Sequence, residues 1–127
     1  MQYDSIDGLD KKISKLIMGN DNQTDFEEAS KLWDHWIEMG GNAFDNAHVY
    51  GGGSMEILLG KWHCRRDNLN DLVIIAKGAH TPNCDPKSLS QQLTESLDRL
   101  QTETVDIYIM HRDNLDIPVD EFVDVLN

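Results

Sequence analysis

Four side chains of the sequence have the types needed to protonate a carbonyl oxygen while a hydride reaches its carbon. They are Asp45, Tyr50, Lys77 and His111, and each falls at or just past the end of a predicted β-strand. Parallel α/β barrels build their active sites from residues at the C-terminal ends of several strands. The sequence therefore predicts that these four residues come together in one site.

The chemistry of such a site follows from how its groups ionise. A free tyrosine has a pKa near ~10 and holds its proton firmly at neutral pH. A lysine ammonium close by favours the phenolate, and a carboxylate keeps that lysine charged and oriented. A histidine can hydrogen-bond the substrate oxygen and fix the direction of the carbonyl. Tyr50, Lys77, Asp45 and His111 supply one group of each kind.

Each of these residues also has a purely structural interpretation. Tyr50 stands beside a glycine run and could be a turn aromatic, Lys77 and Asp45 could form an ordinary ion pair at a strand end, and His111 could be an exposed loop residue. Groups with perturbed ionisation arise for structural reasons too. The occurrence of all four residues, in order and at strand ends, favours a functional site over the structural interpretation.

The elements that must position these residues alternate between strand and helix four times. Strands are predicted over 13–18, 42–47, 72–76 and 105–110. Apolar residues at helical spacing lie between them, and a fourth helix is predicted over 118–126. Thr24 is a plausible N-cap for the first helix, with Glu27 at the capping-box spacing, and Asp85-Pro86 begin the third. The alternation predicts parallel crossovers within a single α/β domain spanning residues 1–127.

Four parallel strands with helices on one face leave two unpaired edges and an uncovered inner face. Barrels remove such edges by closure. We therefore predict a (β/α)8 TIM-barrel type of fold of which about the first four βα units are present, so that a C-terminal half-barrel or self-association must cover the edges. An open doubly wound sheet is the alternative, but the first loop, Met18 to Asp21, has no glycine-rich fingerprint for a nucleotide.

Composition excludes several classes of protein. Hydrophobic residues make up 39% of the chain and charged residues 27%, which is typical of a globular domain. A net charge of −12 argues against nucleic acid or an anionic membrane as partner. The apolar runs are too short to cross a bilayer and no secretory leader is visible, so we expect a cytoplasmic location. Cys64 and Cys84 have no metal-site spacing, and no metal is expected.

The remaining distinctive residues are assigned to structure. The other histidines are expected on the surface, and the tryptophans on helical stripes are expected to pack in the interior. These residues are His35, His48, His63 and His80, and Trp33, Trp36 and Trp62. The run Gly51, Gly52 and Gly53 lacks the lysine and spacing of a phosphate-binding loop, so we expect a flexible loop tip there.

Three motifs, in the correct order, resemble those of the aldo-keto reductase family. The segment GGNAFDNAHVYG at 40–51 is similar to the signature at the second strand of that family, with Asp45 and Tyr50 five positions apart. Lys77 matches its strand-end lysine. The segment LTESLDR at 93–99, followed by VDIY at 105–108 and by His111, is similar to its second recurrent motif.

The resemblance implies a (β/α)8 barrel and NADPH-dependent reduction of an aldehyde or ketone to an alcohol. Tyr50 would be the general acid and Lys77 the cation that activates it. Asp45 would pair with Lys77, and His111, with Tyr50, would bind the substrate carbonyl. The nicotinamide end of the cofactor would lie near Gly19, Asn20 and Asp45. In the family, the main grip on the dinucleotide belongs to the last four units.

Two functions from different classes are consistent with the sequence. The first is a carbonyl reductase, favoured by the retention of all four side chains. The second is a half-barrel without turnover that binds or assembles with a partner chain. The absence of a phosphate clamp among residues 1–127 favours that second function for the chain taken by itself.

Overall fold

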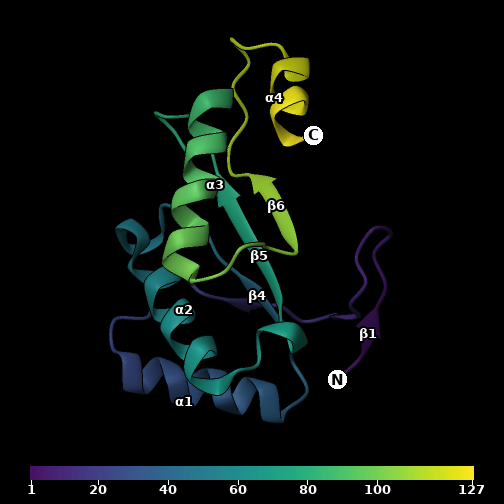
Figure 1. The fold of residues 1–127 in the computed structure, drawn as a ribbon, viewed down its shortest axis with the longest axis vertical. Helices are drawn as coiled ribbons and strands as arrows, with labels where there is room; N and C mark the ends of the chain where they lie inside the picture. Colours follow the sequence, from purple (N-terminus) through teal and green to yellow (C-terminus); the bar gives the residue numbers. More distant parts are fainter.

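A four-stranded parallel sheet organises the computed structural model, which describes residues 1–127 (Figure 1). Its strands lie side by side in chain order: β3 (Met18–Gly19), β4 (Ala43–Asp45), β5 (Val73–Gly78) and β6 (Ile107–Met110). The connecting helices are α1 (Phe26–Glu38), α2 (Ser54–Arg66) and α3 (Pro86–Leu100), and α4 (Val119–Leu126) follows β6. The predicted repetition of strand and helix is confirmed. None of the helices is both long and apolar enough to cross a membrane.

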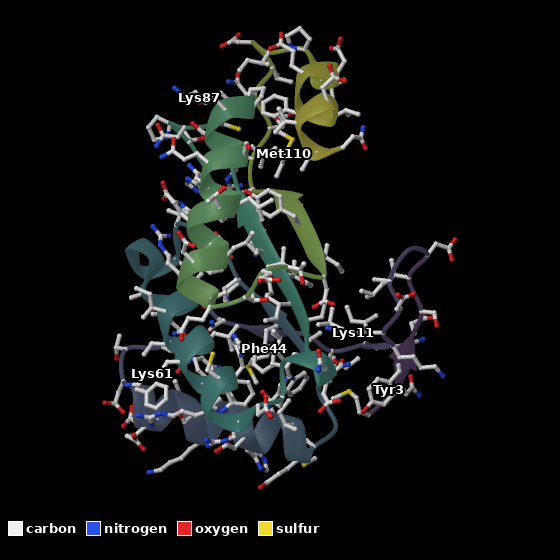
Figure 2. All side chains as sticks on the ribbon, in the orientation of Figure 1. Tyr3, Lys11, Phe44, Lys61, Lys87 and Met110 are labelled. Carbon is white, nitrogen blue, oxygen red and sulfur yellow. The ribbon has the colours of Figure 1, made fainter.

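The predicted first strand over 13–18 is wrong in its boundaries because the chain divides there. Two of its residues form β2 (Ile13–Ser14), which pairs antiparallel with β1 (Tyr3–Asp4) in a hairpin outside the main sheet. Parallel pairing begins only at Met18, opposite Phe44. The ammonium of Lys11 holds the hairpin to the sheet, 2.8 Å from Asp106 Oδ1 and 2.7 Å from the carbonyl oxygen of Leu72 (Figure 2).

The outer layer of the core fills the space between the sheet and the helices. Trp33 of α1, Phe44 of β4 and Trp62 of α2 are fully buried, with ring centroids 5.5–6.3 Å apart. Figure 2 shows Phe44 among the side chains of this layer. The prediction that Trp33 and Trp62 pack in the interior is confirmed. Trp36 is half-buried at the margin of the same cluster.

The opposite face of the sheet carries the candidate site. Side chains alternate between the two faces of a strand. Since Phe44 and Ile74 face the helices, Asp45 and Lys77 lie on the other face, toward the carboxyl ends of their strands. The hairpin closes the amino ends of this inner face, where Ile13 packs on buried side chains of β4 and β5. The expected uncovered inner face is thus covered at one end and open at the other.

Helix starts follow short polar side chains. The N-cap of α1 is Asp25, whose Oδ1 accepts from the Glu28 backbone N–H at 2.9 Å, and the predicted cap Thr24 is wrong by one residue. Asp85 caps α3 by accepting from the Ser88 N–H at 2.8 Å, as predicted. Each bond satisfies an N–H that the helix itself leaves unpaired.

One histidine that we expected on the surface lies between two helices instead. His63 of α2 is buried, and its Nε2 donates to the carbonyl oxygen of Leu100 at the end of α3, 2.6 Å away. The two helices approach closely here because Gly60 has no side chain, and a Cβ at that position would lie 2.5 Å from the carbonyl oxygen of Arg99. Among the other histidines, His35 is exposed as predicted.

Candidate active site

The loops after β4 and β6 are both hydrogen-bonded to the carboxyl end of β5. The N–H of His48 donates to the carbonyl oxygen of Lys77 at 2.9 Å, and the N–H of His111 donates to that of Gly78 at 2.6 Å. These bonds continue the parallel ladder past the last assigned residues of β4 and β6. They bring the chain on either side of Lys77 to the same end of the sheet, which is where the predicted site residues lie.

Asp45 and Lys77 form an ion pair on the inner face. The Lys77 ammonium donates to Asp45 Oδ1. The lysine side chain is only 12% exposed and that of Asp45 is 38% exposed, so the ammonium is enclosed while part of the carboxylate meets solvent. A largely enclosed charge needs such a partner, because burial without one is costly. The pairing predicted between these residues is present.

Tyr50 reaches the same position from the next turn. Its N–H donates to the carbonyl oxygen of Ala47 at 3.0 Å, and it begins the 3₁₀ turn η1 (Tyr50–Gly53). The Lys77 ammonium lies 4.9 Å from the centre of the Tyr50 ring. The ring of His111 meets that of Tyr50 edge to face, with centroids 5.7 Å apart. The structure thus brings all four predicted catalytic residues together, although their catalytic roles stay predictions.

The surroundings of His111 favour its neutral imidazole, which has one ring nitrogen that donates a hydrogen bond and one that accepts. Its Nδ1 is buried and has no partner within the protein. Burial lowers the pKa of His111 below its ordinary value, and nearby positive or protonatable groups lower it further. Those groups are His80, Lys77 and Arg112, opposed by Asp45. The neutral imidazole is therefore favoured near neutral pH.

A further residue of this site was missed by the sequence reasoning. His80, expected on the surface, is half-buried and meets the His111 ring edge to face at 4.7 Å between centroids. Its Nδ1 donates to the carbonyl oxygen of Thr81 at 2.9 Å, which fixes the tautomer of the neutral ring. The only available signal was its position three residues after Lys77, in a loop that follows a strand end.

The residues expected near a nicotinamide differ in how they are presented. Gly19 ends β3 and is exposed, and a Cβ placed on it meets nothing within 4 Å. Asp45 has one oxygen on Lys77 and a partly exposed carboxylate. The Asn20 side chain is fully buried and donates to Asn46 Oδ1 at 3.1 Å, and its backbone N–H donates to the carbonyl oxygen of Asp45 at 3.0 Å. The roles of these three residues toward a cofactor stay predictions.

The sequence model of the Aldo/keto reductase family matches residues 15–127. The chain belongs to the aldo/keto reductase family, and the resemblance inferred from the sequence is confirmed.

Two curated relatives illustrate the range of this similarity. The chain is 28% identical to the uncharacterized oxidoreductase YrpG of Bacillus subtilis over 95% of its own length and 43% of that protein. It is 33% identical to a probable voltage-gated potassium channel subunit beta of Oryza sativa subsp. japonica, over 100% of its length and 42% of that protein. The chain therefore spans less than half the length of either relative.

Solved structures show the same fold. The holo form of the aldo-keto reductase AKR11C1 from Bacillus halodurans superposes with a TM-score of 0.85 at 27% identity, over 98% of this chain and 45% of that one. The thermostable aldo-keto reductase Tm1743, in complex with the inhibitor epalrestat, gives a TM-score of 0.84 at 29% identity, over 99% and 48%. The predicted fold class is confirmed: the chain is part of a TIM-barrel type of fold.

Proposed function

We propose that this protein reduces an aldehyde or ketone to an alcohol with NADPH as hydride donor. The observation that carries the proposal is the convergence of Asp45, Lys77, Tyr50 and His111 at one end of the sheet. Membership of the aldo/keto reductase family supports an oxidoreductase acting on small carbonyl compounds. We further propose a cytoplasmic location, which is compatible with the free thiols of Cys64 and Cys84.

In this mechanism the protein orients the carbonyl and supplies a proton. His111 hydrogen-bonds the carbonyl oxygen and aims it at the Tyr50 hydroxyl. Gly19 and Asp45 would hold a reduced nicotinamide, which would supply the hydride that the carbonyl carbon accepts. As negative charge develops on the oxygen, Tyr50 donates its proton and becomes a phenolate. The Lys77 ammonium stabilises that phenolate, and solvent then restores the proton.

The ion pair serves this proton transfer. An ammonium as enclosed as that of Lys77 needs a charged partner, because burial of an unpaired charge is costly. The Asp45 carboxylate accepts a hydrogen bond from it, and the ammonium lies 4.9 Å from the centre of the Tyr50 ring. The neutral form of His111 is the one that suits hydrogen bonding to a carbonyl without competing for the proton that Tyr50 delivers.

The test is aldehyde-dependent oxidation of NADPH by the purified protein and by Tyr50→Phe. The substitution removes only the hydroxyl, and we expect kcat to fall by about 10²- to 10⁴-fold, the usual contribution of a general acid. Tyr3→Phe is the matched control, since it also removes one hydroxyl, here one in the exposed hairpin that donates to the carbonyl oxygen of Gly40. Equal turnover by Tyr50→Phe and the parent would refute the proposal.

A second candidate function is assembly with a partner chain, and a specific observation favours it. Strands β3 and β6 each have a neighbour on one side only, so both edges of the sheet are unpaired. A relative of 33% identity is named as a probable channel subunit. We propose that a complementary half-barrel, or a second copy, covers these edges. Sedimentation of the purified protein as a well-folded monomer would count against the assembly function.

A further inference from the structure

We propose that Arg99 is a positioning residue that fixes the turn carrying Tyr50, an inference that rests on the proposed function. Arg99 lies in the last turn of α3 and does not line the inner face of the sheet. Its guanidinium instead reaches the segment between Asp45 and Tyr50 from the side of the helices. The residue therefore acts on the site through the backbone of that segment.

The first contact is with the backbone itself. Arg99 Nη1 donates to the carbonyl oxygen of His48 at 3.1 Å. On the other side of the same residue, the His48 N–H donates to the carbonyl oxygen of Lys77 at 2.9 Å. His48 is thus held between the strand that carries Lys77 and the helix that carries Arg99. Because Tyr50 follows two residues later, its ring position depends on this clamp.

The second contact explains why an arginine is present. Glu56 of α2 is fully buried, and its Oε2 accepts from Arg99 Nη1 at 3.2 Å. A buried carboxylate without a cation would be strongly destabilising, so Glu56 anchors the guanidinium in place. The mechanism proposed above makes no use of this buried charge. We therefore infer that the role of Glu56 is to hold the Arg99 guanidinium in place.

A third group completes the cluster. Glu95, one turn before Arg99 on α3, lies 3.5 Å from Arg99 Nη2 through its Oε2. The same oxygen accepts from His48 Nε2 at 2.6 Å. The side chain and the backbone carbonyl of His48 are therefore both bound to this cluster. Only a planar fork with several donors can reach a carbonyl and two carboxylates at once.

The glycine run fits the same geometry: Gly51 and Gly52 are exposed, as expected at a loop tip, whereas Gly53 is not. Gly53 is buried with φ +96°, and a Cβ there would lie 2.5 Å from the guanidinium carbon of Arg99. The turn η1 thus lies directly against the guanidinium, in space that a side chain would fill. A residue other than glycine at this position would displace either the arginine or the turn that begins with Tyr50.

The experiment compares kcat for the parent, for Arg99→Lys and for the double variant Arg99→Met/Glu56→Gln. Arg99→Lys keeps a charge for Glu56 but loses the fork, and the double variant removes the buried charge together with its partner. Arg66→Met is the matched control, because Arg66 joins α2 to Asp34 of α1 away from this turn. Circular dichroism gives the folded fraction, so that kcat is expressed per folded protein.

We expect both Arg99 variants to lose on the order of tenfold to a hundredfold in kcat, the effect of small misplacement of a reacting group. The Kd for NADPH of the two Arg99 variants should stay near the parent value. The kcat of Arg66→Met should also stay near that of the parent. Unchanged kcat per folded protein in both Arg99 variants would overturn the inference.

A readout without turnover separates this inference from the proposed function. In ¹³C-tyrosine NMR, the resonance lost in Tyr50→Phe identifies the ring. We expect that resonance to move in both Arg99 variants and not in Arg66→Met. If the parent protein reduces no carbonyl compound but the resonance moves, the proposed function fails and the positioning role stands. If the resonance stays in place, the positioning role fails.

Discussion

The protonation of a single ring, that of His111, makes the stability of the folded protein depend on pH. Burial and then the His80, Lys77 and Arg112 groups lower its pKa, while Asp45 acts in the opposite direction. The folded protein therefore binds this proton less readily than the unfolded chain does. The unfolded chain takes up its proton as the pH falls through about 6.5. The neutral ring costs the fold nothing above that pH, and stability is lost as the pH falls below it.

The neighbouring imidazole gives a direct prediction. In His80→Phe an aromatic ring still packs on His111, but the imidazole whose charge lowers the pKa of His111 is gone. We expect the pKa of His111 to rise, because two imidazoles in contact resist double protonation. The acidic limb of the pH–rate profile should move to higher pH by the same amount.

The measurement is the titration of the His111 ring by proton NMR, alongside kcat/KM from pH 4.5 to 8. His35→Asn is the control, since His35 is exposed on α1 and pairs only with Glu38. A titration of His111 that is identical in His80→Phe and in the parent would show that the two rings are not coupled.

At the scale of helices and strands, the contact between α2 and α3 determines where Arg99 lies. Gly60 of α2 packs on the carbonyl oxygen of Arg99, and a Cβ there would lie 2.5 Å from that oxygen. Gly60→Ala must push the two helices apart. We expect a loss of about 1–3 kcal/mol in the free energy of unfolding, which is the range for overpacking, together with a reduced kcat.

Gly19→Ala is the matched control for that measurement, which uses urea denaturation. A Cβ at Gly19 meets nothing within 4 Å, so its stability should stay within about 0.5 kcal/mol of the parent, as for most unstrained surface changes. Equal stability of the two variants would show that α2 and α3 are not in the contact described here.

Most of the fold could be predicted from local patterns. Strands with continuous apolar runs, such as β5, and caps such as Asp85 depend on neighbouring residues in the sequence. The division of the segment 13–18 could not be predicted, because it depends on pairing of Ile13 with Asp4 across a hairpin. Thr24 and Asp25 are both good caps, and only the geometry of the turn decides between them.

In the candidate site, too, residues that belong to local motifs could be predicted, and residues that act through long-range contacts could not. Asp45, Tyr50, Lys77 and His111 could be predicted because each lies at or just past the end of a strand and belongs to a motif. The contacts of His63, His80 and Arg99 join segments that are distant in the sequence. Histidines and arginines of this kind look like surface residues until the packing of helices and loops is known.

At the scale of the whole molecule, the unpaired edges of the sheet bear more directly on assembly than the net charge of −12 does. Beside the β3 edge, Leu16 is 65% exposed and lines an apolar hollow of about 590 Å³ with Met18, Leu32 and Trp36. Closure of the barrel by another half would bury this surface. Two copies of so acidic a chain would repel each other, and that repulsion favours a complementary half over a second copy.

If another half-barrel covers the surface around Leu16, a charge placed there should be unfavourable. Leu16→Asp should lower the thermal stability and the activity, because a carboxylate would be buried without a partner at the closing surface. Leu115→Asp is the control, since Leu115 is 93% exposed in the loop before α4. Differential scanning fluorimetry and NADPH oxidation report on both variants. If both variants have the thermal stability and the activity of the parent, the β3 edge is not a closing surface.

The measurement that tests the central claim most directly is the transfer of a labelled hydride. The purified protein is incubated with NADPH carrying deuterium at both C4 positions and with an aromatic aldehyde, and the alcohol is analysed by mass spectrometry. The site described here predicts deuterium at the carbinol carbon with the parent protein. Product formation should be nearly absent with Tyr50→Phe. Unlabelled alcohol, or equal labelled product from Tyr50→Phe, would contradict it.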